Sequence, residues 1–297
     1  MGLDELAGKL AGVVAIPVTP FDEQDAVDTR ALERVLLRIV DGGITVVTAG
    51  GNTGEFSALT VEETRLAVEV AASAVGSRAT VVAGVGGPVP AAIEAARHAR
   101  RAGAAAIMIH QPVHPYISPA GWVDYHRAVA TAADDLGVVL YLRDPRISAA
   151  DLVRLREAAP NVIAVKYGIA DQVRFGDLVA EAGPFTWIAG LAEPAAPGCF
   201  ALGATGFTSG LANVVPELSL DLLKALRAGE SETVRRLWRR IRPFERLRVS
   251  GASENNVSVV KEALAQRGVC RRDVRPPSHV LDEDGREQVR RILDGLA

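Results

Sequence analysis

The chain has 297 residues, 48% of them hydrophobic, and a formal net charge of -3. This length suits one large domain, or one domain with an appendage, and is ample for a sizeable core. The near balance of charges excludes the general basic footprint of a nucleic-acid-binding protein and gives no attraction to an acidic membrane. No apolar stretch is long enough to span a bilayer, so we expect neither a nucleic-acid partner nor a membrane segment.

The cysteines and the N-terminal residues indicate a cytoplasmic protein. Cys199 and Cys270 are far apart and form neither a metal-binding nor a disulfide pattern, which fits a reduced, intracellular compartment. Residues 1–10 include Asp4 and Glu5 and lack the basic start and apolar run of a signal peptide. We therefore predict a cytoplasmic location.

Eight short apolar runs alternate with helical patterns over the first 230 residues. Pro17 and Pro20 force an extended loop after the first run. Thr60 and Glu63 have the spacing of a capping box at the start of a helix. Strands are predicted at residues 13–16, 44–48, 80–83, 105–109, 138–141, 162–166, 185–188 and 205–208. Helices are predicted to begin near residues 28, 60, 119, 148, 171, 194 and 216, and a further helix ends at 101.

This alternation predicts an α/β fold, a (β/α)8 TIM barrel. A doubly wound open sheet is the alternative, but it would normally have fewer strands and a full phosphate-binding fingerprint, which residues 84–88 lack. After Glu230 the strands stop, and residues 231–249, 253–266 and 284–296 show three helical patterns. We therefore predict a barrel at residues 1–230 and a C-terminal three-helix appendage at residues 231–297.

The sixth predicted strand carries a lysine at its end. Residues 162–165 are continuously apolar, as expected for a strand that is buried on both faces, and Lys166 follows them. Burial disfavours the charged form of a lysine, and a neutral amine attacks a ketone to form a Schiff base. The alternative interpretation is a lysine at the rim of the barrel whose ammonium group extends into water.

A barrel of this kind collects its chemistry at the carboxyl ends of the strands. Tyr141 ends the fifth strand and Lys166 ends the sixth, and neighbouring strands lie about 4.8 Å apart. The pair therefore fits a nucleophile and a general acid/base that reach one small substrate. Asn52 and Thr53 lie in the glycine-rich loop after the second strand, although Asn and Gly also favour simple tight turns.

Two other groups of side chains have plainer interpretations. His110 and His114 follow the fourth strand, but no third ligand is evident, so we interpret them as loop histidines and predict no metal. Seven arginines between residues 235 and 248 could contact nucleic acid or an acidic metabolite. Such a run is more often a solvated helix face or part of a subunit contact.

Several motifs together carry a family resemblance. They are Pro17-Val-Thr-Pro-Phe21, Gly51-Asn-Thr-Gly-Glu55, Tyr141, Val165-Lys166 and Gly203-Ala-Thr-Gly206 leading into Asn213. With these motifs the chain resembles the dihydrodipicolinate synthase / N-acetylneuraminate lyase family of class I aldolases over nearly its whole length. The three C-terminal helices also match the family pattern.

The resemblance implies a mechanism and a set of site residues. Lys166 would form an imine with the ketone of a 2-oxo acid, and Tyr141 would transfer protons during imine formation and the later step. The loop around Thr53 would hold the substrate carboxylate through backbone N–H groups and a hydroxyl. The resemblance also implies a small-molecule substrate, no metal or organic cofactor, and a homo-oligomer, either a dimer or a tetramer. The substrate-binding residues implied are Gly51, Asn52, Thr53, Arg143, Thr208 and Ser209.

The sequence departs from the dihydrodipicolinate synthases and is similar to another branch. Those synthases have two threonines in the second-strand loop, where this chain has Asn52 first, and a relay tyrosine near the position of His114. The Gly54-Glu-Phe56 and Tyr141-x-Arg143-Asp144 patterns are similar to the 5-dehydro-4-deoxyglucarate dehydratases, which dehydrate and decarboxylate a sugar diacid. In that branch Arg143 would bind the distal carboxylate, because a guanidinium fork suits a carboxylate.

Two functions of different classes follow. The first is a Schiff-base lyase acting on pyruvate or a sugar-derived 2-oxo acid. The second is a catalytically inactive barrel that binds a 2-oxo acid or serves in regulation. Ligand binding that survives Lys166→Ala would indicate the second, whereas joint loss of covalent trapping and turnover would indicate the first.

Overall fold

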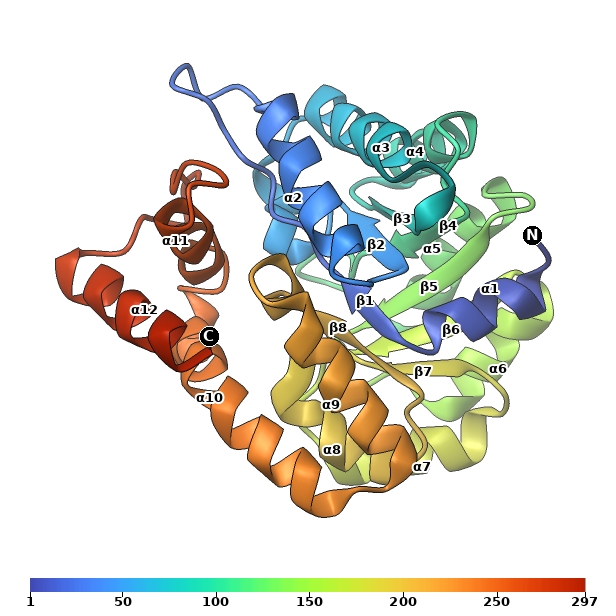
Figure 1. Cartoon of the computed structure of the whole chain (residues 1–297). Coiled ribbons are helices and arrows are strands. Elements are labelled where there is room, and N and C mark those ends of the chain that lie inside the picture. Colours follow the sequence, from blue (N-terminus) through green and yellow to red (C-terminus); the bar gives the residue numbers. More distant parts are fainter. Residues whose placement is uncertain (297) are drawn as a thin grey trace.

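The computed structural model describes residues 1–296, which contain a closed barrel of eight parallel strands joined in sequence order (Figure 1). The predicted TIM barrel is therefore confirmed. The strands are β1 Val13–Ala15, β2 Val46–Ala49, β3 Thr80–Val85, β4 Ala106–Ile109, β5 Gly137–Leu142, β6 Val162–Tyr167, β7 Thr186–Ala189 and β8 Gly206–Ser209.

Helices follow the strands and cover the outside of the barrel. Their first turns are fixed by side-chain caps that the sequence predicts, namely Asp28, the Thr60–Glu63 capping box and Ser148. The helix predicted near Pro194 begins slightly earlier, at Ala192. The barrel helices are α2 Thr29–Asp41, α3 Val61–Val75, α4 Val89–Arg101, α5 Pro119–Ala132, α6 Ala149–Ala158, α7 Gln172–Ala182, α8 Ala192–Ala201 and α9 Pro216–Ala228.

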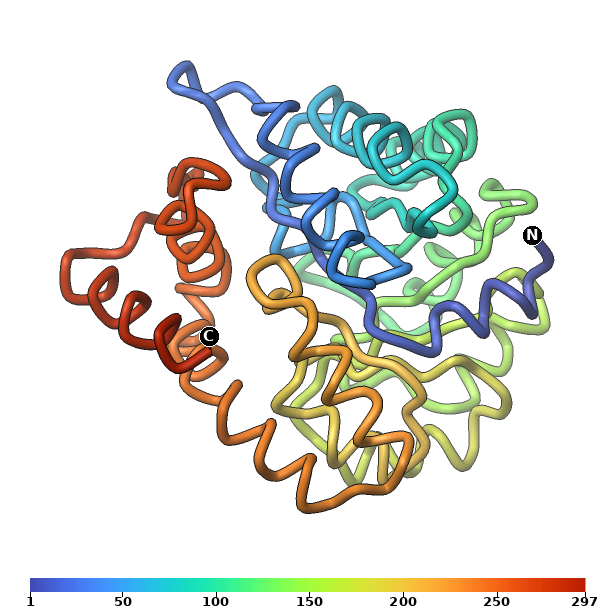
Figure 2. The backbone as a smooth tube through the Cα atoms, viewed as in Figure 1, coloured from blue at the N-terminus to red at the C-terminus, as the bar shows by residue number. Residues whose placement is uncertain are grey.

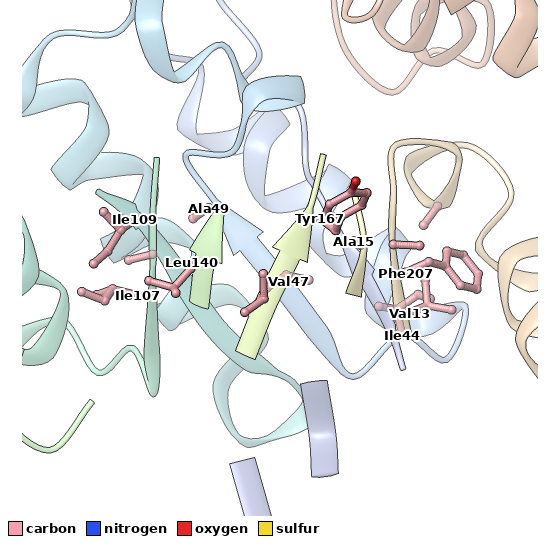
Figure 3. Packing of buried hydrophobic residues seen from close by; sticks show 14 of the residues in the cluster. Val13, Ala15, Ile44, Val47, Ala49, Ile107, Ile109, Leu140, Tyr167 and Phe207 are labelled. Carbon is pink, nitrogen blue, oxygen red and sulfur yellow. The ribbon is translucent and has the colours of Figure 1, made fainter. Parts of the chain in front are cut away.

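The strands divide their side chains between two apolar clusters. The larger cluster joins the outer face of the barrel to the helices, and Figure 3 shows Ile109 and Leu140 of this cluster on paired strands. The smaller cluster fills the barrel interior and includes Tyr141 and Ala164. Because successive side chains of a strand point to opposite faces, Lys166 shares the inner face of β6 with Ala164.

A helix at the N-terminus closes the bottom of the barrel. Helix α1 (Leu3–Leu10) was not predicted from the sequence, yet Leu6 and Leu10 are buried members of the inner cluster. The carbonyl of Ala7 accepts a hydrogen bond from Thr186 at the start of β7. A side chain at Gly137, the first residue of β5, would come within 2.5 Å of Leu6. Helix α1 therefore covers the amino-terminal end of the barrel, opposite the strand ends that carry Tyr141 and Lys166.

Three helices form the C-terminal appendage after β8 and α9. They are α10 Ser231–Ser253, α11 Ser258–Gln266 and α12 Glu283–Leu296. The helix predicted at 253–266 begins only at Ser258, because residues 250–252 have non-helical backbone angles. Figure 2 shows this segment leaving the barrel beside α9 and returning towards its mouth. Residue 297, the last of the predicted appendage, lies outside the described residues, and the division into two domains stays a prediction.

No helix among residues 1–296 is long and apolar enough to cross a membrane.

Candidate active site

Lys166 and Tyr141 lie side by side inside the barrel. They are paired in the register of β5 and β6, and the Nζ atom of Lys166 is 4.0 Å from the centre of the Tyr141 ring. Only 4% of Lys166 is exposed. Thr48 and Thr208, from β2 and β8, line the same small internal space as Lys166. The structure thus brings together the two residues that the sequence placed at adjacent strand ends.

The surroundings of Lys166 favour the neutral amine. Burial, followed by the positive charges of Arg143 and Arg248, lowers its pKa to about 7. Among residues 1–296 no carboxylate pairs with Lys166 to restore the charged form. A substantial share of the lysine is therefore unprotonated near neutral pH, as a nucleophilic amine must be. Burial also raises the pKa of Tyr141, which keeps its phenol protonated and able to donate.

The loop after β2 lies against Tyr141. The amide of Asn52 donates a hydrogen bond to the Tyr141 hydroxyl over 3.4 Å. A side chain at Gly51 would come within 2.4 Å of Ile16, so this turn requires glycine. Thr19, in the predicted proline-rich loop, donates to the carbonyl of Gly54 over 2.7 Å. This hydrogen bond joins the loop after β1 to the loop after β2.

Arg143 extends from the end of β5 into a cleft of about 870 Å³. Its guanidinium carbon is 5.8 Å from the centre of the Tyr141 ring. A side chain at Gly168 would come within 2.7 Å of Tyr141 and 3.3 Å of Arg143, so the glycine makes room for both. Arg143 is exposed and has no hydrogen-bond or ion-pair partner in the described part of the chain, which leaves its donors available.

The cleft combines barrel loops with the appendage. Its lining includes Asn52, His110 and Tyr141 from the barrel, and Val257 and Arg275 from the C-terminal segment. Lys166 is not part of this lining, but its Nζ atom lies 4.0 Å from the ring of Tyr141, which is. Tyr141 is therefore the contact between the cleft and the lysine.

Ser209, a predicted substrate-binding residue, does not lie with the residues around Lys166 and Tyr141. Its hydroxyl donates to Glu193 over 2.5 Å and lies 3.1 Å from the hydroxyl of Ser219, all three side chains being fully buried. Because Thr208 and Ser209 are consecutive in β8, they point to opposite faces, and only Thr208 faces the barrel interior. Burial and the charge of Glu245 raise the pKa of Glu193 to about 7.

Arg248 is a site neighbour that the sequence did not single out. The interpretation of the arginine run as a solvated helix face or a subunit contact is wrong for Arg248, which is only 3% exposed. Arg248 forms an ion pair with Glu245 over 2.7 Å and donates to Asn256 over 3.0 Å and to Thr53 over 3.4 Å. The spacing of Glu245 and Arg248, three residues apart on one helix, is the signal that could have indicated a pair.

A buried lysine beside a tyrosine at the carboxyl ends of adjacent barrel strands defines the architecture of a class I, Schiff-base-forming lyase. Comparison with known proteins identifies the family. A sequence model described as "Dihydrodipicolinate synthetase family" matches residues 9–296. The chain belongs to the dihydrodipicolinate synthase family and is a Schiff-base lyase of that family.

Individual relatives carry two different names. A probable 5-dehydro-4-deoxyglucarate dehydratase from Saccharopolyspora erythraea is 34% identical over 285 residues, covering 94% of this chain and 92% of the relative. One of the same name from Bacillus subtilis is 27% identical and covers 97% and 94%. The crystal structure of dihydrodipicolinate synthase from Bacillus clausii is similar with a TM-score of 0.94 and 38% identity, covering 98% of this chain and 99% of that one.

Proposed function

We propose that this protein is a dehydratase that forms a Schiff base between Lys166 and a sugar-derived 2-oxo acid with two carboxylates, of the 5-dehydro-4-deoxyglucarate type. One observation carries the proposal: Lys166 is buried against Tyr141 with no carboxylate partner among residues 1–296, and its pKa is lowered to about 7. The names of the similar dehydratases support the choice of substrate.

The reaction can be written with the residues at hand. The neutral Nζ of Lys166 adds to the substrate ketone, and loss of one water gives a protonated imine. The imine withdraws electrons, so the neighbouring carbon loses a proton and the hydroxyl on the next carbon leaves with a proton as a second water. The distal carboxylate then leaves as carbon dioxide, and its bonding electron pair moves along the new double bond into the imine. Protonation of the resulting dienamine restores the imine, and its enol becomes an aldehyde. Addition of water to the imine then releases the product and restores the lysine. Tyr141 carries protons between these steps, since its ring lies 4.0 Å from the reacting nitrogen and its phenol is protonated.

The two carboxylates of such a substrate have separate candidate sites. The turn of Gly51, Asn52 and Thr53 would receive the carboxylate next to the ketone through backbone N–H groups and the Thr53 hydroxyl. Arg143 would bind the distal carboxylate, because its guanidinium group is unpaired in the described chain and lines the cleft. Thr208 borders Lys166 and remains a candidate contact. Ser209 is dropped from the set, because its hydroxyl is engaged by Glu193.

The synthase reaction fits these residues less well. The contact to the Tyr141 hydroxyl comes from the Asn52 amide rather than from a threonine hydroxyl. Tyr116, the tyrosine in the loop after β4, is 86% exposed and contacts His114 of its own loop. A homo-oligomer stays a prediction.

Reductive trapping tests the proposal. The protein is incubated with pyruvate, and separately with 5-dehydro-4-deoxyglucarate, in the presence of borohydride, and the adduct is located by intact mass and peptide mapping. We expect an adduct on Lys166 that Lys166→Ala abolishes, together with consumption of the sugar diacid without borohydride. Trapping of pyruvate without turnover of the diacid would refute the substrate assignment. Absence of any adduct on folded protein would favour the inactive, ligand-binding barrel.

A further inference from the structure

The ring of His110, directly after β4, is held in one orientation by several independent contacts. It stacks on Phe56 with ring centres 3.9 Å apart and an angle of 15° between the planes. Its Nε2 atom lies 2.8 Å from the carbonyl oxygen of Gly50. A side chain at Gly84 would come within 2.9 Å of Nε2, and one at Gly86 within 3.2 Å of the His110 Cβ atom and of the Phe56 ring, so two glycines make room for the pair.

These contacts decide which nitrogen of His110 carries the proton. A carbonyl oxygen only accepts hydrogen bonds, so Nε2 must be protonated and donate to Gly50. Burial lowers the pKa of His110 to about 4, so the ring is neutral near pH 7 and Nδ1 holds a free lone pair. Within residues 1–296 Nδ1 makes no hydrogen bond. It is also not among the fully buried polar atoms, so part of its surface is exposed. It is therefore reachable from the cleft that His110 lines.

The free acceptor lies where the chain of a bound substrate would extend. The His110 ring approaches Tyr141 edge-on, with ring centres 6.2 Å apart, and the Nζ atom of Lys166 lies 4.0 Å from the centre of the same Tyr141 ring. Two polar neighbours cannot serve as the acceptor: Arg143 only donates, and the side-chain oxygen of Gln111 accepts from Trp122 over 3.1 Å. The side-chain oxygen of Asn52, whose amide donates to Tyr141, is a second acceptor in the cleft. A substrate hydroxyl at this point needs an acceptor, and Nδ1 provides one.

We propose that His110 is a specificity-determining residue whose Nδ1 accepts a hydrogen bond from a hydroxyl on the carbon chain of the substrate. This inference rests on the proposed function, since it requires a 2-oxo acid bound to Lys166. It names the substrate class more closely, as a 2-oxo acid that carries a hydroxyl group beyond the ketone. Pyruvate has no such hydroxyl and gains nothing from His110.

His110→Gln separates this role from a structural one. The amide nitrogen of glutamine lies about as far from the backbone as Nε2 does. It can therefore keep the hydrogen bond to the carbonyl of Gly50, while the acceptor at the position of Nδ1 is removed. We expect reductive trapping of pyruvate to stay within about twofold of the wild type. We expect kcat/KM for the hydroxylated diacid to fall about five- to tenfold, the value of one hydrogen bond. His110→Asn, which returns an amide oxygen near the depth of Nδ1, should recover part of the loss.

The matched control is His114→Gln in the same loop. His114 is exposed, and its Nδ1 already accepts from the backbone N–H of Tyr116 over 3.1 Å, so both substrates should be handled as by the wild type. An equal loss with pyruvate and with the diacid in His110→Gln, or no loss with either, would overturn the inference while leaving the proposed function intact. Absence of an adduct in the wild type would instead overturn the proposed function, and this inference with it.

Discussion

Lys166 and Lys261 are both buried lysines, 4% and 0% exposed, and each ammonium group lies 4.0 Å from the centre of an aromatic ring. Burial is the largest cause of a lowered pKa in both. They differ in their charged neighbours. Lys261, on α11, pairs with Glu55 over 2.5 Å and donates to the carbonyl of Asp273, and both carboxyl-bearing residues oppose the effect of burial.

Lys166 faces arginines instead of carboxylates, so nothing offsets its burial. The comparison shows that burial alone does not make a lysine reactive, because the partner decides whether the ammonium group is retained. Lys261 uses its charge to attach the appendage to the loop after β2, where Glu55 lies. The ammonium group of Lys166 instead loses its proton near neutral pH.

Replacing Lys166 with methionine should have the largest effect. We expect borohydride trapping to disappear and turnover to fall by roughly a thousandfold or more, since the nucleophile is removed. The midpoint of thermal unfolding should not fall, because the change removes a buried ammonium group that has no carboxylate partner. Intact mass and a thermal melt measure the two effects. An adduct that persists on another lysine of the variant would contradict the assignment of Lys166 as the reactive lysine.

Replacing Lys261 with methionine should give the opposite pattern. The change leaves Glu55, 5% exposed, without its counter-ion. We expect the free energy of unfolding to fall by about 3–5 kcal/mol, while folded protein still traps an imine on Lys166. Urea unfolding measures the loss. The double variant Lys261→Met/Glu55→Gln is the control and should recover part of the stability. Unchanged stability in the single variant would show that this ion pair does not hold the appendage.

The pH dependence of imine formation should follow Lys166. With its pKa near 7, the rate of cyanoborohydride trapping should rise about tenfold per pH unit below 7 and level off above it. A profile that keeps rising to about pH 10 would show an ordinary lysine.

The same pKa also predicts how stability depends on pH. The folded-state pKa of Lys166 lies below the unfolded value of 10.5, so the unfolded chain binds more protons between about 7 and 10.5. Wild-type stability should therefore rise with pH across this window. The stability advantage of Lys166→Met should be full below about pH 7 and shrink towards about pH 10.5, as denaturant unfolding at several pH values would reveal.

Arg143→Leu should produce the smallest change in this series. Removing this positive charge raises the pKa of Lys166 and moves the pH profile of trapping upward. Because Arg143 is exposed, we expect a shift of about half a pH unit or less, smaller still in high salt. Arg127→Leu, on the exposed face of α5, is the control and should leave the profile in place. A shift to lower pH would contradict the role assigned to Arg143.

Much of the fold could be predicted from the sequence because its signals are local. The apolar runs, the caps at Asp28 and Ser148, and the two prolines after β1 each act within a few residues. The order of eight strand–helix units then places Tyr141 beside Lys166, since sequential strands of a closed barrel are neighbours. Helix α1 is not among the predicted elements, although Leu3, Leu6, Ala7 and Leu10 have the spacing of one helix face.

Only the tertiary structure decided which side chains surround the reactive pair. Arg248 contacts Thr53 across 195 positions of sequence, and the hydroxyl of Ser209 is engaged by the buried Glu193. The tautomer of His110 depends on a carbonyl 60 residues away. Partners this distant leave no local pattern. The sequence by itself therefore determined the barrel and the lysine–tyrosine pair, whereas long-range packing determined the charge of the lysine, the acceptor in the cleft and the attachment of the appendage.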